Sequence, residues 1–520
     1  MPFADSAETA RRWATERAID LWVIYASDFD PGTLARMRDA HLQIVADGGK
    51  FALVIPEGGV PTETESLICL YRIESNYAPE PWGIFSAMAY SGTLDVRKVG
   101  VLAAHPDSVL AAQRAGCGAI VALADEGVRE RWPLIVAQPD FIIEPEGLAA
   151  LDRDRFSSKR AHRQRVLLNP GPSVVSDRVH RAIGGPDLCH REPEYSDILE
   201  RVRAKLLDVA GVGDDWAMAM LAGSGTSALE SMVLSSVRPG KKLLVCRNGV
   251  YGDRAAKIAE RAGVDVASVP ASDLTPINPT DVAAALDANP DIDAVFVVHH
   301  ETTTGLLNPV NAIAAEANSR GVLVAVDAIS SLGAEDLPLL DSGIDMVAST
   351  SNKCLHGLPG AAFVLISPRG QKRIAEVPPK SLYFDLAAYL AAQKKRTVPF
   401  TPAIPALYSL DAALDELMEE TLEHRKELYA ARMAAVDRDL AGLGLSARVA
   451  PEHRSRCVRS FPLPDGFDYD TLHDQLKERG YVVYAGLGDA AKTTFRVCAL
   501  GSMTVEGMEG FTAALAEVVS

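Results

Sequence analysis

Short apolar segments recur along this 520-residue chain, and stretches with helical spacing separate them. Five of them lie in the middle of the sequence, at 217–221, 242–246, 294–299, 322–327 and 346–349. Strands that are apolar throughout are typical of parallel sheets covered by helices on both faces. The pattern therefore predicts an α/β domain built around a mainly parallel sheet.

A polar, charge-dense stretch at 151–165 divides the chain, and its side chains are poor candidates for a core, so we predict a linker there. Residues 1–150 contain β-like runs at 21–25, 51–55, 99–103 and 119–123 between helix-like segments, which predicts a small α/β domain with a parallel sheet. After the linker we expect a large domain at 166–405 and a smaller α+β subdomain at 406–520, which the first residues, about 166–185, can join. The smaller subdomain begins with a long helix-like run, 406–443.

The overall composition excludes several classes of protein. A net charge of −17 opposes an extended basic surface, so neither nucleic acid nor an anionic membrane is an expected partner. Residues 1–20 contain no apolar segment of a secretory signal, and the longest apolar runs are too short to cross a bilayer, which favours a cytoplasmic protein. The seven cysteines are odd in number and never spaced Cys-x-x-Cys, which argues against a disulfide framework and a metal site.

Two charged residues stand at the ends of apolar strands. Asp327 ends one of them, where an ionised carboxylate is costly unless a cation meets it. Lys353 follows the next one, just before the Gly/Pro-rich turn 357–360. Because functional sites in α/β sheets gather beyond the carboxyl ends of the strands, both side chains should point into one crevice. The plainer alternatives are an aspartate that caps a helix near Ser330 and a solvated surface lysine.

Two further segments suit a phosphorylated, flat cofactor. Ser224, Gly225 and Thr226 follow a strand and open a helix, where glycine lets the backbone approach a phosphate and the helix offers free N–H groups. Tyr251 lies between two glycines, where its ring could contact a cofactor. A capped turn without a ligand and a packing tyrosine remain open. Together with a lysine and an aspartate, these residues supply what pyridoxal phosphate needs from a protein.

Several segments, taken in order, resemble one known family. They are 168–172 (LNPGP), 189–195 (CHREPEY), 223–226 (GSGT), 248–252 (NGVYG), 300–305 (HETTTG), 326–328 (VDA), 352–354 (NKC) and 495–497 (FRV). Over residues 165–520 the chain resembles the class V, fold-type I pyridoxal-phosphate aminotransferases, and within them the group that acts on 2-aminoethylphosphonate and pyruvate.

The resemblance implies a role for each matching residue. Lys353 would bind the cofactor covalently and then act as the general acid and base, and Asp327 would hold the pyridinium nitrogen. Tyr251 would stack on the ring, and Arg496 would clamp the carboxylate or phosphonate of the substrate. The phosphate would be bound by Ser224, Gly225 and Thr226, with Thr401 reaching it from a partner subunit; Thr302 and Thr304 would lie near the phenolic oxygen, and Asn169 and Gly171 near the substrate.

The implied activity is a ping-pong transfer of the amino group from 2-aminoethylphosphonate to pyruvate, which gives phosphonoacetaldehyde and L-alanine, in a homodimer. Alternatives of the same class are alanine:glyoxylate and serine:pyruvate aminotransferases; a cysteine desulfurase-like lyase or a non-enzymatic scaffold fits less well. Two departures from the family lie near the expected substrate pocket. Cys498 and Ala499 stand where a family member has Gly-Asn, and Asn169 stands where the family has threonine.

The N-terminal domain resembles another family in part. Residues 98–108, 111–117 and 139–143 resemble the last motif of haloacid-dehalogenase-like hydrolases. Asp28 and Asp30 mimic the nucleophile of that family, but Thr33 lies one residue too far along, and His105-Pro106 replaces an expected Gly-Asp pair. We therefore expect a non-catalytic domain. A bifunctional enzyme whose N-terminal domain hydrolyses a phosphonate or phosphate is the alternative.

Overall fold

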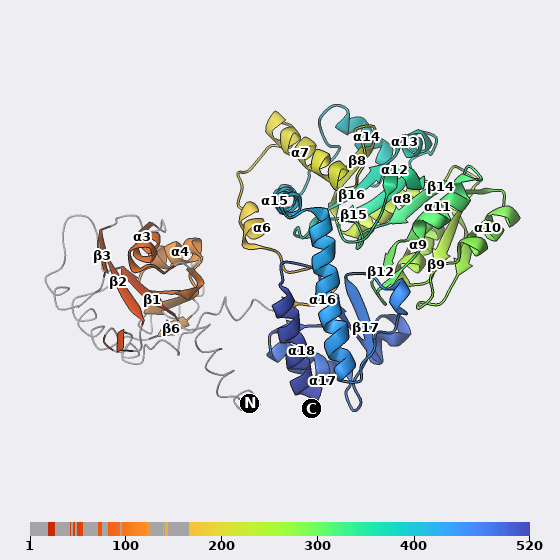
Figure 1. The fold of residues 1–520 in the computed structure, drawn as a ribbon. Helices are drawn as coiled ribbons and strands as arrows, with labels where there is room; N and C mark the ends of the chain where they lie inside the picture. The colour runs from red at the N-terminus through yellow and green to blue at the C-terminus, as the bar shows by residue number, and fades with distance from the viewer. Residues whose placement is uncertain are drawn as a thin grey trace. The chain divides into compact units, whose positions relative to one another are not determined.

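The computed structural model describes residues 19–25, 42, 45–46, 49–55, 71–74, 82–93, 96–123, 139, 141–143 and 166–519. The chain divides into two compact units, 1–165 and 166–520, and each is described separately. Figure 1 shows the helices and strands of both.

The first unit contains a six-stranded parallel sheet in the order β3-β2-β1-β4-β5-β6. Its strands are β1 (Leu21–Tyr25), β2 (Lys50–Ile55), β3 (Tyr71–Glu74), β4 (Val99–Ala103), β5 (Ala119–Leu123) and β6 (Phe141–Ile143), accompanied by α3 (Trp82–Ser91), η3 (Val96–Lys98) and α4 (Pro106–Ala115). The four strands predicted here are confirmed, because β1, β2, β4 and β5 occupy the expected residues.

The second unit is built on a seven-stranded mixed sheet in the order β10-β9-β11-β14-β15-β16-β8. Its strands are β8 (Ala217–Gly223), β9 (Lys242–Arg247), β10 (Asp265–Pro270), β11 (Ile292–Val298), β14 (Leu323–Asp327), β15 (Met346–Thr350) and β16 (Gly360–Ile366). The pairs from β10 to β15 are parallel, whereas β16 runs antiparallel to both β15 and β8. The mainly parallel sheet is confirmed, and β16, which the apolar pattern did not single out, completes it.

The apolar strands divide their side chains between two cores. Along β14, Val324 and Val326 join one hydrophobic core, while Leu323 and Ala325 join the core on the opposite face. This is why the strand is apolar at every position before Asp327. Figure 1 shows the helices that surround the sheet. They are α7 (Pro193–Val209), α8 (Gly225–Leu234), α9 (Val250–Arg261), α10 (Pro279–Ala288), α11 (Val310–Asn318), α12 (Leu339–Ser342), α13 (Pro368–Ala375) and α14 (Leu386–Gln393).

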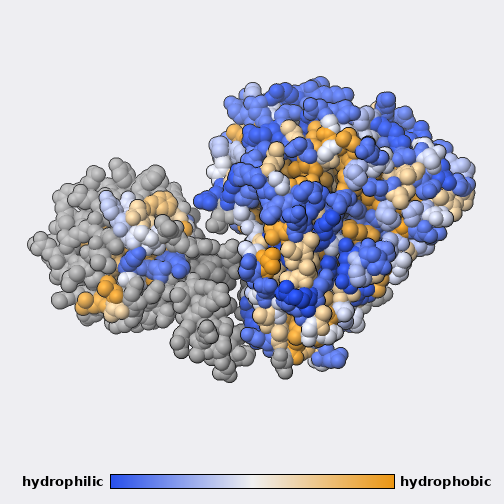
Figure 2. Space-filling view, viewed as in Figure 1, coloured by the Kyte–Doolittle hydropathy of each residue, from blue (hydrophilic) through white to orange (hydrophobic). Residues whose placement is uncertain are grey.

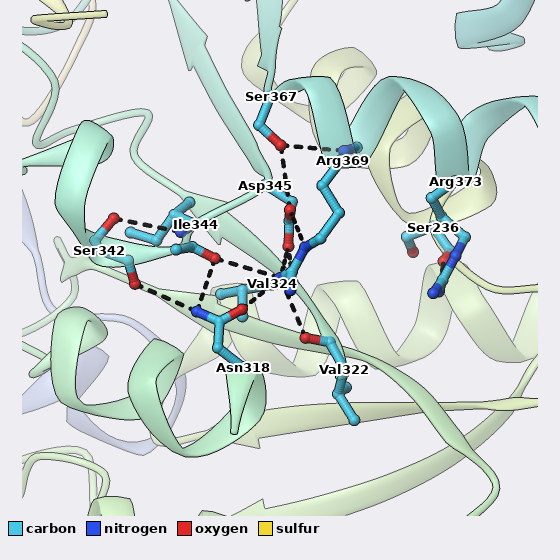
Figure 3. Close-up of polar contacts among 12 residues, drawn as sticks. Ser236, Asn318, Val322, Val324, Ser342, Ile344, Asp345, Ser367, Arg369 and Arg373 are labelled. Atoms are coloured by element: carbon cyan, nitrogen blue, oxygen red, sulfur yellow. Dashed lines mark hydrogen bonds and ion pairs between the residues drawn. The ribbon is translucent and has the colours of Figure 1, made fainter. Parts of the chain in front are cut away.

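A buried carboxylate fastens the amino ends of two central strands (Figure 3). Asp345, just before β15, accepts hydrogen bonds from Val324 N at 2.8 Å, from Ser367 Oγ at 3.1 Å and from Arg369 Nε at 2.6 Å. Arg369 also bonds to Asn318 Oδ1 at 2.5 Å. The network ties β14 and β15 to the first turn of α13, and the opposite ends of these two strands carry Asp327 and lead to Lys353.

The C-terminal part has its own antiparallel sheet, β17-β20-β19, formed by β17 (Val458–Pro462), β20 (Thr494–Cys498) and β19 (Tyr484–Ala485). A two-residue strand, β7 (Val166–Leu167), pairs with β18 (Tyr481–Val482), which brings the start of this unit to its C-terminal part. Around them lie α16 (Leu422–Gly442), α17 (Tyr469–Glu478), α18 (Val505–Val519), η6 (Pro451–His453) and η7 (Gly488–Lys492); the remaining elements are α6 (Asp177–Ala182), β12 (His300–Glu301), β13 (Leu306–Leu307) and α15 (Ile404–Glu420).

The helix-like run expected at 406–443 is two helices rather than one. Thr421 separates α15 from α16 with a φ of +75°, and its hydroxyl accepts a hydrogen bond from His424 N at 3.3 Å, which caps α16. Leu410 and Leu414 of α15 pack into the core of the large sheet, whereas α16 packs into the core of the C-terminal part. The change of core therefore comes at Thr421, later than the boundary expected at 406.

Hydrophilic side chains cover much of the visible face of the second unit, and hydrophobic ones gather between α7 and α14 (Figure 2). A small cavity in this region is lined mainly by aromatic and aliphatic side chains, including Tyr195, Met220 and Tyr389. Within the described parts of the chain, every helix is too short or too polar to span a bilayer.

Candidate active site

Asp327 and Lys353 lie at the same edge of the large sheet. Asp327 is the last residue of β14 and pairs in register with Ala348 of the neighbouring parallel strand β15, and Lys353 follows the end of β15. The positive charge of Lys353 lowers the pKa of Asp327, and the negative charge of Asp327 raises that of Lys353, so each side chain lies within electrostatic range of the other. The structure therefore brings together the two residues that the sequence singled out.

The amine of Lys353 sits in a largely desolvated position. Its Nζ donates a hydrogen bond to the carbonyl oxygen of Pro170 at 2.5 Å. Burial lowers the pKa of this amine from its ordinary value and outweighs the nearby groups, including Asp327, that raise it. Burial thus favours the neutral form of Lys353, which can attack an aldehyde or accept a proton.

A loop from the start of the unit encloses this amine. Gly171 has a φ of +127°, and a Cβ atom there would lie 2.5 Å from Lys353 Cδ and 2.7 Å from its Nζ. Only glycine leaves room for the lysine at that position. The side chain of Asn169 is buried, and its Nδ2 donates to Pro172 O at 2.8 Å, so it braces the loop.

Asp327 is a buried carboxylate without a cation at ion-pair distance in the described part of the chain. Its Oδ1 accepts a hydrogen bond from Ile329 N at 2.9 Å. Burial raises its pKa to about 6, although the Ile329 amide and the charges of Lys353 and Arg254 act in the opposite direction. The residues that follow it form turns rather than a helix, so Asp327 does not cap a helix near Ser330. Such a carboxylate can hold a protonated ring nitrogen.

The predicted phosphate cradle lies beside Asp327. Ser224 is the N-cap of α8, and its side chain makes no capping hydrogen bond. A Cβ at Gly225 would lie 2.7 Å from Ile329 Cδ1, so this turn packs closely against the residue that bonds to Asp327. The first backbone N–H groups of a helix have no partner within it, which leaves them available to an anion. Thr226 Oγ1 accepts a hydrogen bond from Arg254 Nη1 at 3.3 Å.

Thr302 links the aromatic residue to the expected substrate clamp. Its hydroxyl donates to Tyr251 Oη at 3.0 Å, and its carbonyl oxygen accepts from Arg496 Nη1 at 3.0 Å. Arg496 also donates through Nε to Ala485 O at 2.8 Å. Tyr251, Thr302 and Arg496, which lie far apart in the sequence, thus form one hydrogen-bonded chain.

Arg496 is a buried guanidinium with a relative exposure of 3% and, among the described residues, no carboxylate at ion-pair distance. Burial lowers its pKa, and Tyr251, Cys498 and Glu301 act in the opposite direction. Its two hydrogen bonds go to carbonyl oxygens, so three of its five N–H groups are left for a ligand. A buried, uncompensated cation of this shape is suited to a carboxylate or phosphonate.

Sequence reasoning missed Glu301, whose carboxylate connects the loop of Thr302 to the start of α9. Its Oε2 accepts from Tyr251 N at 3.4 Å, and its Oε1 accepts from the hydroxyl of Thr303 at 2.8 Å. A Cβ at Gly249 would overlap this carboxylate, which explains the glycine before the tyrosine. Burial raises the pKa of Glu301 to about 7. The only sequence signal for it was its place in the 300–305 segment.

Two predicted site residues, Thr304 and Thr401, make no side-chain hydrogen bond to the other site residues in the described part of the chain. Thr304 is buried, and its hydroxyl has no hydrogen-bond partner among the described residues. Thr401 is exposed and lines the cavity near α14 with Tyr383 and Phe400. In the part of the chain that the structure describes, Thr401 makes no hydrogen bond to the cradle residues, so its expected role in a partner subunit stays a prediction.

Comparisons with known proteins agree with this architecture. The aminotransferase class-V family matches residues 176–506, and the chain belongs to that family. It is 34% identical over 357 residues, or 68% of this chain and 96% of the relative, to a 2-aminoethylphosphonate–pyruvate transaminase of Burkholderia thailandensis. A transaminase of the same name from Vibrio vulnificus is 32% identical over 358 residues, with 67% of this chain and 96% of the relative covered.

Solved structures give the same picture of the fold. An aspartate aminotransferase from Thermus thermophilus aligns with a TM-score of 0.63 and 30% identity, covering 68% of this chain and 98% of that one. An alanine–glyoxylate aminotransferase from Nostoc aligns with a TM-score of 0.65 and 26% identity, covering 69% and 96%. Residues 166–519 thus have the fold-type I aminotransferase fold, and the chain is a transaminase.

Proposed function

We propose that this enzyme uses pyridoxal phosphate to transfer the amino group of 2-aminoethylphosphonate to pyruvate, giving phosphonoacetaldehyde and L-alanine. The observation that carries the proposal is the buried guanidinium of Arg496, which has no carboxylate partner in the described part of the chain. Arg496 lies close enough to Lys353 for its charge to lower the pKa of that amine. Each proposed substrate is a small anion, and the relatives named for this reaction support the choice.

The residues around Lys353 and Asp327 fit the cofactor. Lys353 supplies the amine, Asp327 a carboxylate for the ring nitrogen, Tyr251 an aromatic face, and the first turn of α8 a phosphate cradle. When bound, pyridoxal phosphate supplies an electron sink that stabilises negative charge on the carbon bearing the amino group. Thr302 and Thr304 lie on the loop that would face the phenolic oxygen.

The protein supplies binding and proton transfer. Arg496 binds the phosphonate and orients the amine toward Lys353. In its neutral form, the Nζ of Lys353 would accept the proton from the carbon that carries the amino group and would return it as the general acid. Asp327 would hold the protonated ring nitrogen. In the second half of the reaction, Arg496 binds the carboxylate of pyruvate, and Lys353 delivers the proton to its C2.

The test is the ultraviolet–visible spectrum of the purified enzyme during titration with 2-aminoethylphosphonate and no acceptor. The visible absorption of the lysine-bound cofactor should disappear, and added pyruvate should restore it while alanine forms. Lys353→Ala should abolish both changes, whereas Lys257→Ala, which removes an exposed lysine of α9, should leave them unchanged. A coloured enzyme that ignores the phosphonate would refute the proposed donor, and a protein that binds no pyridoxal phosphate would refute the cofactor.

An alanine–glyoxylate activity is the second candidate, because a solved structure with that name shares the fold and 26% identity. Cys498, in the strand of Arg496, marks a departure from the group that acts on the phosphonate. A panel of donors separates the two, since turnover of alanine with glyoxylate but not of the phosphonate would favour this candidate.

We also propose a homodimer in which Thr401 reaches the cradle of the partner subunit, supported by the exposed position of Thr401 at the aromatic cavity. Sedimentation at the mass of one chain would contradict it.

We propose that the first unit is a non-catalytic, haloacid-dehalogenase-like domain. Its support is the parallel sheet and the position of His105 and Pro106, which begin α4 after β4. Asp28, Asp30 and Thr33 lie outside the described residues. Release of phosphate from phosphonoacetaldehyde would overturn this assignment.

A further inference from the structure

Arg254, which the sequence patterns did not single out, contacts two parts of the proposed cofactor site, the start of α8 and the ring of Tyr251. It is on the first turns of α9, and its Nη1 donates to Thr226 Oγ1 at the start of α8. Its guanidinium carbon lies over the ring of Tyr251, 5.0 Å from the ring centroid. One side chain therefore contacts both a cradle residue and the aromatic residue.

The charge of Arg254 has no counter-ion among the described residues. The neighbouring carboxylate of Asp253 bonds instead to Arg247 Nε, at 2.8 Å. Asp327 lies near enough for Arg254 to lower its pKa, yet the two form no ion pair. The single hydrogen bond to Thr226 leaves the other N–H groups of Arg254 without a described partner.

The position of this cation, beside the start of a helix, favours an anion. The N-terminus of a helix carries a partial positive charge, and a cation beside it is repelled, whereas an anion is attracted. Arg254 adds a full positive charge at the second residue of α8. Because Thr226 Oγ1 accepts from Arg254, its own hydroxyl hydrogen remains free to be donated. Both groups can then donate to the same anion.

We propose that Arg254 binds the phosphate group of the cofactor together with the first turn of α8. The inference rests on the proposed function, because it concerns the same cofactor. Arg496, tied to Thr302 and Ala485, is left to bind the anionic group of the substrate. The two uncompensated arginines thus divide the anions between them, and the stacking of Arg254 on Tyr251 couples phosphate binding to the position of the ring.

The experiment compares pyridoxal phosphate with pyridoxal, which lacks the phosphate but forms the same bond to Lys353. The cofactor is removed from wild type, Arg254→Gln, Arg254→Lys and Arg247→Gln, and each protein is titrated with both compounds by absorbance. The Arg247 variant is the matched control, because Arg247 is a nearby arginine already paired with Asp253. Thermal melting and circular dichroism check that each variant is folded.

Arg254→Gln should weaken the binding of pyridoxal phosphate about 10- to 100-fold, which is the range for loss of a hydrogen bond between charged groups. The dissociation constant for pyridoxal should stay within about twofold of the wild-type value. Arg254→Lys should fall between wild type and Arg254→Gln, since it keeps the charge but not the planar fork. If Arg254→Gln does not fold, the ratio of the two dissociation constants for Arg254→Lys decides. Arg247→Gln should match wild type.

Two results would overturn the inference. Equal weakening of both compounds would mean that Arg254 only supports Tyr251. Unchanged binding of pyridoxal phosphate, with a raised KM for the phosphonate, would assign Arg254 to the substrate. Failure of the proposed function looks different, because wild type itself would then bind no pyridoxal phosphate or fail to prefer it over pyridoxal.

Discussion

Replacement of Arg496 by glutamine should remove the anion clamp and leave the rest of the site intact. In the structure, two N–H groups of its guanidinium donate to Thr302 O and Ala485 O, and three N–H groups remain for a substrate. A bidentate contact with a phosphonate uses two of these. Hydrogen bonds to charged groups contribute about 1.5–3 kcal/mol each, so the loss is about 3–6 kcal/mol. At about 1.4 kcal/mol per factor of ten, kcat/KM for 2-aminoethylphosphonate should fall about 10²- to 10⁴-fold.

The assay should compare 2-aminoethylphosphonate with ethylamine, which has the same reacting carbon but no anionic group. Wild type should strongly prefer the phosphonate, and Arg496→Gln should lose that preference while its activity on ethylamine stays within a few fold. Arg496→Lys, which keeps the charge but loses the planar fork, should lie between them. Binding of pyridoxal phosphate should not change. The reasoning is refuted if both amines lose activity equally, or if the phosphonate loses none.

Three further predictions concern Asp327, Gly171 and Glu301. Asp327→Asn should still bind pyridoxal phosphate by absorbance but lower kcat about 10- to 100-fold, since one charged hydrogen bond is lost; unchanged turnover would contradict the role of Asp327. Gly171→Ala should destabilise the protein by about 1–3 kcal/mol through its positive φ and also slow capture of the cofactor by Lys353, as measured by melting and stopped-flow absorbance. Gly211→Ala, with a φ of +65° and open space around it, is the control and should cost stability alone. Burial raises the pKa of Glu301 from 4.5 to about 7, so between these pH values the folded state keeps a proton that the unfolded state has released. The free energy of unfolding should therefore fall as pH rises from about 4.5 to 7, by on the order of 3 kcal/mol. Glu301→Gln should flatten that part of the melting-temperature profile, and an identical profile for wild type and variant would show that Glu301 does not titrate there.

The sequence was sufficient for five of the seven strands of the large sheet, all except β10 and β16, and for the two residues at its edge. A strand buried on both faces is expected to be apolar along most of its length, as β14 is before Asp327 and β15 is at 346–348, and few other structures satisfy that requirement. A charged residue at the end of such a strand then has to lie at the sheet edge. Asp327 and Lys353 could be placed for that reason, before any distance between them was known.

The parts that the sequence did not predict depend on contacts between distant segments. The helix run across Thr421 contains no glycine or proline at the break, and its end is explained by the positive φ of Thr421 and by the separate cores that the two helices join. Arg254 and Glu301 are charged residues in mixed segments, where the usual expectation is a solvated side chain. The role of Arg254 depends on its hydrogen bond to Thr226, and that of Glu301 on its hydrogen bond from Tyr251. The fold brings these partners together from distant parts of the sequence.

The acidic composition of the chain and the anionic ligands proposed for it are compatible because they act over different distances. A net charge of −17 acts through solvent, where salt screens it within about 8 Å at physiological ionic strength. At the proposed site, Arg254 and Arg496 have no carboxylate at ion-pair distance among the described residues. Burial also raises the pKa of Glu301 to about 7, so this acid is partly protonated near neutral pH and cancels less positive charge than a formal count suggests. Short-range, desolvated cations therefore decide which ligand binds, and the net charge of the chain does not.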